Sequence, residues 1–531
     1  MAFKLNLTKI YFLVLLSTVC AQSTIEPEKL INELGCGNCH IGAERSTLIS
    51  MRAPDLTNAG SKYNPSYIYD YLKEPHSVRK NIGLSRMPNF NLSDEEAFAL
   101  SLYLRTKKNQ ISSRHYNKGD KNIDAVKLIS EDYQCTSCHL LNGDGLDRSI
   151  DLNSTGTRLK KEWIYETIFY PQKHIAQGTS MPMFFDEDDE ASIAVVGSMT
   201  QYIYGKGKDE LKQLDKKFNS AQKRFSETTS EQGKQIFLSQ NCISCHTMES
   251  ETTWFSGHNA PDLSGQIMRT KKAWLLSYLQ NPNPIRPNGY FPGTGSRMPN
   301  YSLNPDEVNS VMEWLGSFPQ TTAIEEISDF QIKKAQNLLD NQLSCLGCHQ
   351  LNNKGGKIGP DLTNAGNRLT DGYIKMSLER PHIVMPESIM PKQIINKNTT
   401  QLLQSFLKMQ VGNSNNESSA YFNLIENQPY QIDDLYVANC AVCHGLNGAG
   451  DGFNAKYLPT PPGNLSDSEI ISKRSDDTLY ETLYNGGRLM KKHHFMPSWG
   501  LKLSHEEIVY LVSKIRKFCD CDPPEWSENK K

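Results

Sequence analysis

The chain has 531 residues, a formal net charge of −2 and 38% hydrophobic residues, with a mean hydropathy of −0.54. These values exclude a fibrous or membrane-embedded class, and no basic surplus points to a nucleic acid as partner. The length predicts about three to five domains. The 13 cysteines are too few for a disulfide scaffold of this size and too many to be incidental. Attachment of a metal or cofactor is therefore the first function to test.

The N-terminus has the layout of a secretory signal peptide. Lys4 and Lys9 precede an apolar run at 10–16, and Val19-Cys20-Ala21 offers a cleavage site. The run is too short to span a bilayer. We therefore expect residues 1–21 to be removed and the mature protein to be periplasmic or otherwise exported. Cys20 leaves a second interpretation open, a lipid-modified cysteine that tethers the protein to a membrane, although Val19 is a poor residue directly before it.

A Cys-x-x-Cys-His motif occurs five times, at 36–40, 135–139, 242–246, 345–349 and 440–444. Chance would supply about 0.008 such motifs at this cysteine and histidine content. Successive first cysteines are 99, 107, 103 and 95 residues apart. Each repeat is therefore the size of one small domain.

The spacing within the motif suits covalent haem. Two thiols on one helical turn face the same way and can each form a thioether, and the next residue, histidine, reaches the iron. A zinc site would need a second Cys or His pair and a thioredoxin site a βαβ pattern, and no repeat has either. We predict five c-type haems, attached at Cys36, Cys39, Cys135, Cys138, Cys242, Cys245, Cys345, Cys348, Cys440 and Cys443, with iron ligated by His40, His139, His246, His349 and His444.

Every repeat also carries a Met-Pro pair just before its last predicted helix. A thioether opposite the histidine completes a six-coordinate iron and raises its potential. The predicted sixth ligands are Met87, Met181, Met298, Met390 and Met496. Met385 competes with Met390, and Met183 and Met490 are weaker alternatives in their repeats. Histidine ligation would lower the potential, but His76, His174, His382, His493 and His494 are more simply interpreted as surface or loop residues.

Pro-Asp-Leu loops follow three of the motifs, at 53–60, 260–264 and 359–366. These loops and the haem motifs resemble the class I cytochrome c family. In that family the proline carbonyl accepts the second ring N–H of the haem histidine, so the resemblance implies this role for Pro54, Pro261 and Pro360. Residues 149–152 and 462–465 depart from the pattern in repeats two and five. The resemblance implies an all-α fold of five tandem domains, each a small helical bundle around one covalent haem.

The predicted domains are 24–106, 123–204, 230–318, 327–409 and 421–518. The lysine-rich segment 205–229 is most simply a solvated helix or linker, with a docking patch for an acidic partner as the alternative. Residues 412–419 predict a flexible connector. Capping boxes predict helix starts at Ser93, Asn304 and Ser504, and a weaker one at Asn398. Glycine-rich turns are predicted at 142–145 and 445–452. The second of these, with 458–462, resembles class I domains of periplasmic carriers and oxidase subunits.

The expected function is electron transfer through five His/Met-ligated haems between redox partner proteins, without catalysis. Two alternatives remain. One is a cytochrome subunit of a periplasmic dehydrogenase or oxidase complex. The other is a haem enzyme, a peroxidase or reductase, in which one axial ligand is exchangeable. Cys519 and Cys521 attach no haem, and an oxidised pair and two free thiols are both open.

Overall fold

The computed structural model describes residues 25–78, 83–108, 116–174, 179–246, 248, 260–290, 297–319, 326–386, 388–412 and 434–527. The predicted signal peptide, Cys20 and nearly all of the 412–419 connector lie outside these ranges. Helices make up most of the described structure, as predicted. No helix among the described residues combines the length and apolar character needed to cross a lipid bilayer.

The helices of the first two repeats are α1 (Pro27–Leu34), α2 (Thr47–Arg52), α3 (Ala59–Lys62), α4 (Pro65–Lys73), α5 (Asp94–Thr106), α6 (Ala125–Lys127), α7 (Thr155–Arg158), α8 (Lys161–Phe169), α9 (Pro171–His174) and α10 (Glu190–Lys206). The lysine-rich segment forms α11 (Lys208–Arg224). Repeat three contains α12 (Ser230–Ser239), α13 (Gln266–Arg269), α14 (Lys272–Gln280) and α15 (Pro305–Leu315).

Repeat four contains α16 (Asp329–Asn337), α17 (Cys345–Cys348), α18 (Ala365–Arg368), α19 (Asp371–Glu379), α20 (Pro381–Val384) and α21 (Lys397–Lys408). Repeat five contains α22 (Leu435–Asn439), α23 (Ala441–His444), α24 (Ser468–Ile471), α25 (Asp476–Leu489) and α26 (His505–Cys519). The strands of the described residues form two hairpins, β1 (Leu140–Leu141) with β2 (Asp144–Gly145) and β3 (Gln350–Leu351) with β4 (Lys354–Gly355).

The last helix of four repeats begins near the residue that the capping signals predict. Ser93, Asn304 and Ser504 form complete capping boxes at the starts of α5, α15 and α26, so these three predictions are confirmed. The prediction at Asn398 is wrong by two residues. The side chain of Asn396 accepts the cap hydrogen bond from the backbone of Thr399, and Asn398 lies inside the first turn of α21.

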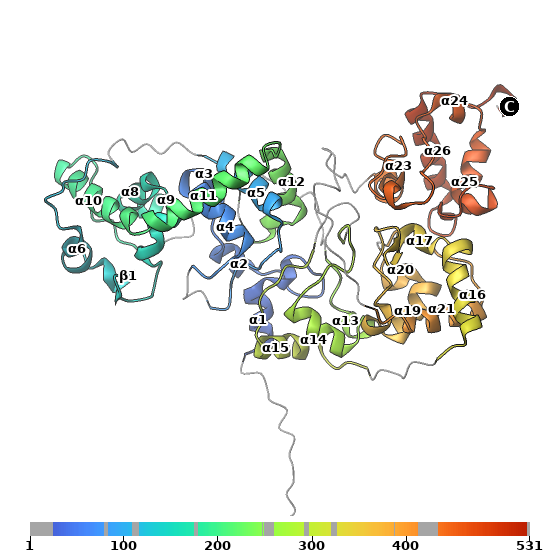
Figure 1. The fold of residues 1–531 in the computed structure, drawn as a ribbon, viewed down its shortest axis with the longest axis horizontal. Helices are drawn as coiled ribbons and strands as arrows, with labels where there is room; N and C mark the ends of the chain where they lie inside the picture. Colours follow the sequence, from blue (N-terminus) through green and yellow to red (C-terminus); the bar gives the residue numbers. More distant parts are fainter. Residues whose placement is uncertain are drawn as a thin grey trace, which may run out of the picture.

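Repeats one and three interlock through their helices (Figure 1). The first helix of repeat three, α12, packs on the last helix of repeat one, α5, and Tyr103 and Phe237 lie 5.5 Å apart between ring centroids. Reciprocally, α1 packs on α15, where Ser310 Oγ donates to the Ile25 carbonyl at 2.9 Å. In repeats four and five the equivalent packing, α16 on α21 and α22 on α26, stays within one repeat.

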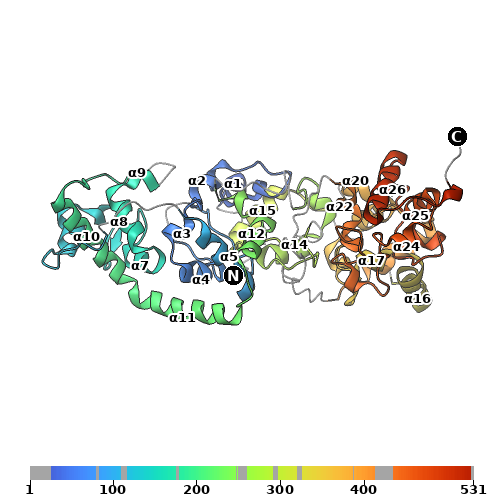
Figure 2. The same cartoon turned by 90° about the horizontal axis from the view of Figure 1, so that it is seen from above.

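Short backbone bridges join the interlocked pair to its neighbours. Lys160 N donates to Lys62 O at 2.9 Å where repeat one meets repeat two. Lys271 N donates to Arg368 O at 2.9 Å where repeat three meets repeat four. Seen from above, the bundles form a row from α10 at one end to α26 at the other (Figure 2).

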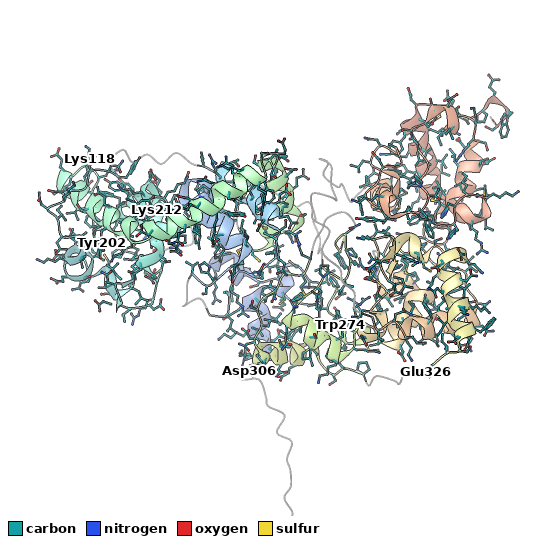
Figure 3. The ribbon with its side chains drawn as sticks, viewed as in Figure 1. Lys118, Tyr202, Lys212, Trp274, Asp306 and Glu326 are labelled. Atoms are coloured by element: carbon teal, nitrogen blue, oxygen red, sulfur yellow. A yellow bond between two sulfur atoms is a disulfide. The ribbon has the colours of Figure 1, made fainter. Side chains whose placement is uncertain are left out.

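The lysine-rich helix α11 packs along repeat one. Its apolar stripe, Leu211, Leu214, Phe218 and Ala221, is buried, and the Phe218 ring lies 5.4 Å from that of Phe98 on α5. Lys217 pairs with Asp70 of α4 at 2.8 Å. Lys212 lies on the outer side of α11 (Figure 3), and its side chain is 61% exposed. Of the helix and the linker that the sequence allowed for this segment, the helix is present, and its packing holds repeats one and two together.

Candidate functional site

Each of the five motifs forms a single tight turn that gathers its two thiols and its imidazole. The backbone N–H of each motif histidine donates to the carbonyl of the first cysteine, at 2.8 to 3.0 Å in every repeat. In repeats one to three the residue before the motif has a positive φ, 69° at Gly35, 49° at Gln134 and 53° at Asn241. This kink ends the preceding helix and starts the turn. None of the ten motif cysteines is in a disulfide.

The motif histidines of repeats two, four and five each contact a carbonyl of their own repeat. His349 Nδ1 donates to Pro360 O at 2.8 Å, as the resemblance implied. His139 Nδ1 donates to Ile150 O at 2.8 Å and His444 Nδ1 to Gly463 O at 3.1 Å. A backbone carbonyl supplies the contact, so the absence of proline at these positions does not remove it. Each bond places the proton on Nδ1. The lone pair of Nε2 is then available to bind a metal.

In repeats one and three the contacts are exchanged. His40 Nδ1 donates to Pro261 O at 2.8 Å, and His246 Nδ1 donates to Pro54 O at 3.0 Å. The prediction that each proline serves the histidine of its own repeat is therefore wrong for Pro54 and Pro261, although both carbonyls have the predicted role. The pairing between repeats is not predicted by the sequence.

The connection after the motif distinguishes the two arrangements. In repeats two and four the β1–β2 and β3–β4 hairpins turn the chain back at once, with Gly143 at φ 90° in the first turn and Asn353 at φ 63° in the second. Repeat five turns through Gly445 at φ 78°, so the predicted glycine turns are confirmed. Repeat one has no such turn: Gly42 leads to α2, and Ile41 O accepts from Leu263 N of repeat three at 2.8 Å.

The predicted methionine ligands follow the same exchange. Met298 packs in the apolar cluster that holds Cys36. Met87 packs in the cluster that holds Cys242. Met496 stays with Cys440 of its own repeat.

In repeats two and four the Met-Pro loops share one local hydrogen bond. Met181 N donates to Thr179 Oγ1 and Met390 N donates to Ser388 Oγ, each at 3.1 Å. The competitor Met385 has its sulfur against Arg286 Nη2 at 3.2 Å. Met183 is 65% exposed.

Several histidines weighed as alternative ligands have other partners. His494 Nε2 donates to Asp340 O at 3.0 Å and so joins repeat five to repeat four. His493 Nδ1 accepts from Phe495 N at 3.3 Å. His76 is exposed and lies edge-on to Tyr71 with 5.2 Å between ring centroids. His382 is partly buried, and the side chain of His174 lies outside the described residues.

A single cavity of about 1730 Å³ runs through three of the motifs. It is larger than the roughly 300–1,000 Å³ of a typical site for one small ligand. Its walls include the thiols and imidazoles of repeats one, three and four, namely Cys36, Cys39, His40, Cys242, Cys245, His246, Cys345, Cys348 and His349. Met87, Met298, Met385 and Met390 also line it. The cavity thus offers attachment and ligation groups for more than one bound group.

Burial favours the neutral form of several motif side chains. It raises the pKa of the Cys36, Cys242 and Cys440 thiols to about 12. Burial also lowers the pKa of His246 and His349, against the opposing effect of the carbonyl bonds. Neutral imidazole is the form that ligates a metal. Among the residues that the structure describes, no three His, Cys, Asp or Glu side chains gather into a metal-binding group, so the thiol pairs lack the further donors of a zinc site.

Buried arginines between the motifs add positive charge to the cavity. Burial lowers the pKa of Arg368 to about 10, and Arg286 lies beside it and also has a lowered pKa from burial. The Nε atoms of Arg158 and Arg269 are buried without a hydrogen-bond partner. A buried guanidinium is stabilised by carboxylates. The two propionates of a haem would supply them, so the arginines, thiols, imidazoles and thioethers together fit this group.

The helix that leads into the fifth motif depends on Asp434. Its carboxylate accepts from Tyr436 N at 2.9 Å and Lys514 Nζ at 2.9 Å. Burial acts to raise the pKa of Asp434, but these bonds outweigh it and hold the pKa below its usual value. Asp434→Ala should therefore cost about 1 kcal/mol of unfolding free energy at pH 7. The cost should vanish as the pH falls through the lowered pKa, because the wild-type carboxylate then protonates. Urea unfolding at pH 7 and pH 3 measures this, and an equal cost at both would contradict it.

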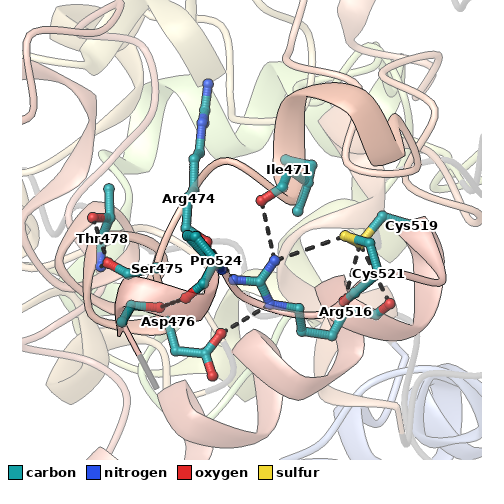
Figure 4. A network of polar contacts seen from close by, with 10 residues as sticks. Ile471, Arg474, Ser475, Asp476, Thr478, Arg516, Cys519, Cys521 and Pro524 are labelled. Atoms are coloured by element: carbon teal, nitrogen blue, oxygen red, sulfur yellow. Dashed lines mark hydrogen bonds and ion pairs between the residues drawn. A yellow bond between two sulfur atoms is a disulfide. The ribbon is translucent and has the colours of Figure 1, made fainter. Parts of the chain in front are cut away.

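Cys519 and Cys521 form a disulfide at the end of α26 (Figure 4). Arg516 donates to the Ile471 carbonyl at 3.1 Å and pairs with Asp476 at 2.9 Å, and its Nη1 lies 3.7 Å from the Cys521 sulfur. Of the two alternatives left open by the sequence, the structure has the oxidised pair. Arg516, beside this pair, anchors the C-terminal end of the last helix to the start of α25.

Comparison with protein families matches three parts of the chain. The model described as cytochrome c matches residues 27–108 and 230–319. The model described as cytochrome c oxidase, cbb3-type, subunit III matches residues 427–513. The two cytochrome c matches are the interlocked repeats, and the third agrees with the resemblance of repeat five to oxidase subunits. Neither curated proteins nor solved structures give a match to this chain.

Proposed function

The chain carries domains of the cytochrome c family, which imply covalent haem and electron transfer, and from this premise we infer that it is an exported pentahaem cytochrome that passes electrons between redox partner proteins. The observation that carries the proposal is shared by all five motifs. In each, two thiols lie on one turn beside an imidazole whose Nδ1 is fixed by a carbonyl. Repeats two and four have this arrangement too, although no family match covers them.

The bound haem iron would supply one-electron redox chemistry at each site. The protein's own residues do the rest. The carbonyl bonds orient each imidazole and raise its basicity. The thioethers of Met87, Met181, Met298, Met390 and Met496 are the proposed sixth ligands, which close each iron to substrate and favour electron transfer over catalysis. For repeat four, the contact of Met385 with Arg286 supports Met390 over Met385.

The arrangement of the motifs supports transfer along the row. Ser244 Oγ lies 3.8 Å from Cys39 Sγ and 3.7 Å from Cys245 Sγ, so the attachment edges of repeats one and three face each other. In the same way, Asn454 Nδ2 donates to Gly347 O at 2.9 Å and lies 3.6 Å from Cys443 Sγ, which joins the motifs of repeats four and five. Cys138 of repeat two is exposed at one end of the row.

Haem counting combined with a redox titration tests the proposal. The purified protein should carry five covalent haems and titrate as five one-electron centres with low-spin His/Met spectra. The double substitution Cys36→Ala/Cys39→Ala should lower the count to four, because one haem loses both attachment points. Substitution of Cys519 and Cys521 is the matched control and should leave five. A count of five in the motif variant would contradict the assignment.

A second candidate function is supported by the match of residues 427–513 to an oxidase subunit. In this case repeat five would deliver or receive electrons within a dehydrogenase or oxidase complex. Isolation from membranes under mild conditions tests it. Stoichiometric co-purification of a flavin or copper subunit would favour the complex, and a soluble protein without such a partner would favour a free carrier.

A further inference from the structure

We infer that repeats one and three build their two haem sites jointly: the iron held by His40 takes Met298 as its sixth ligand, and the iron held by His246 takes Met87. This inference rests on the proposed function and goes beyond it, because the family matches treat 27–108 and 230–319 as two separate domains. In the structure each site draws its attachment motif from one repeat and its Met loop from the other.

The first support is the histidine side of each site. The carbonyls that fix the two imidazoles are exchanged, with Pro261 on His40 and Pro54 on His246. Ile41 and Leu263 continue the pairing at 2.8 Å. Repeat four has the same bond within one repeat, between Gln350 and Leu362 at 2.8 Å. The local geometry is therefore the same, and only the chain connection differs.

The second support is the methionine side. Met298 shares an apolar cluster with Cys36 and with Leu30, Ile31 and Leu34 of α1. Met87 shares another cluster with Cys242 and with residues of α12. Both methionines line the same cavity as the two motifs. Each thioether is thus placed with the motif of the opposite repeat.

The third support is a set of reciprocal contacts that each Met loop makes with the other repeat. Arg86, just before Met87, donates to both carboxylate oxygens of Glu307 at 2.8 Å. Arg297, just before Met298, pairs with Glu96 at 2.8 Å. Asn89 and Asn300 form a two-way backbone bridge between the loops, at 2.6 and 2.7 Å. These contacts fix both loops in the exchanged arrangement.

The exchange sets the order of haems in space. The half of repeat one that borders repeat two, at Tyr63 and Leu159, completes the site of His246. The half of repeat three that borders repeat four, at Thr270 and Leu369, completes the site of His40. Numbered by motif, the haems therefore follow the order two, three, one, four, five. Two of the neighbouring pairs in this order, three with one and one with four, are not consecutive along the sequence.

A marked haem tests the ligand pairing. Cys36→Ala leaves the first haem attached through one thioether, and its retained vinyl group moves the α-band of that haem to longer wavelength. In this background, Met298→Ala should open the marked haem to carbon monoxide, so the difference spectrum appears at the shifted band. Met87→Ala should give a signal of equal size at the unshifted band. The Cys242→Ala background should give the reverse result for both methionines.

The opposite pattern, in which Met87→Ala opens the haem marked by Cys36→Ala, would overturn the exchange while leaving the proposed function intact. A haem count below five before any substitution would instead overturn the proposed function. If a marked variant fails to mature, the same methionine substitutions in the Cys36→Ala/Cys39→Ala protein decide. There Met298→Ala should add no carbon monoxide binding and Met87→Ala should add one equivalent; equal gains from both would also overturn the pairing.

Discussion

Replacing Arg297 with Met should lower the free energy of unfolding of the interlocked pair by about 3–5 kcal/mol. The reason is the burial of its partner: the Arg297 side chain is 7% exposed and that of Glu96 is 1% exposed. Without the guanidinium, the buried carboxylate of Glu96 loses the cation that it pairs with, while its capping hydrogen bond from the backbone N–H of Ser93 remains. The midpoint of urea unfolding, followed by helix circular dichroism, measures the loss.

Two variants serve as controls. Lys212→Met removes one partner of the exposed Lys212–Asp209 pair, whose side chains are 61% and 92% exposed, and should change stability by no more than about 0.5 kcal/mol. Adding Glu96→Leu to Arg297→Met should recover much of the loss, because the buried carboxylate is then removed together with the guanidinium that it paired with. A cost of Arg297→Met equal to that of Lys212→Met would show that the Met298 loop does not pack on α5 in solution.

Gly233→Ala should destabilise the protein by about 1–3 kcal/mol. A Cβ atom at Gly233 of α12 would lie 2.0 Å from the carbonyl oxygen of Ala99 and 2.5 Å from its carbon. These are backbone atoms of α5, so one helix must move away from the other. The effect is expected on unfolding and also on the methionine-to-iron absorption band, because the displaced helix leads into the His246 motif.

Gly205→Ala in α10 is the matched control, since nothing lies within 4 Å of a Cβ atom there. The same substitution should stabilise the protein by about 0.5–1 kcal/mol, because alanine loses less backbone entropy in a helix. If both alanines stabilise to the same degree, the close crossing of α12 and α5 between repeats does not exist.

The sequence alone predicts the parts of each site. A Cys-x-x-Cys-His turn, a Pro-Asp-Leu loop and a Met-Pro loop are local signals, because each depends on a few adjacent residues and on backbone geometry. The capping boxes at Ser93, Asn304 and Ser504 are local in the same sense, and the structure confirms them. The cap of α21 was predicted at Asn398, but Asn396, two residues earlier, has the same side chain and forms the cap.

The pairing of those parts is not a local property. Pro54 and Pro261 present equivalent carbonyls, so the sequence around either one is compatible with His40 and with His246. The available signal is the connection that follows the motif. Repeats two and four have a hairpin that brings the loop back within 11 residues of the histidine, whereas repeat one has Gly42 and the α2 segment. A hairpin closes a site within its repeat, and its absence permits exchange.

The exchange also has a consequence for biosynthesis and truncation. His40 and its partner carbonyl at Pro261 are 221 residues apart, with the whole of repeat two between them. The apolar face of α1, with Leu30, Ile31 and Leu34, is covered by α15. A chain that stops after repeat two would therefore present this face to solvent beside an unfinished first site. Removal of repeats four and five would leave the apolar face of α1 covered and the first site complete. The order in which the sites mature follows the spatial pairing, and the first motif to be made is among those that must wait for repeat three.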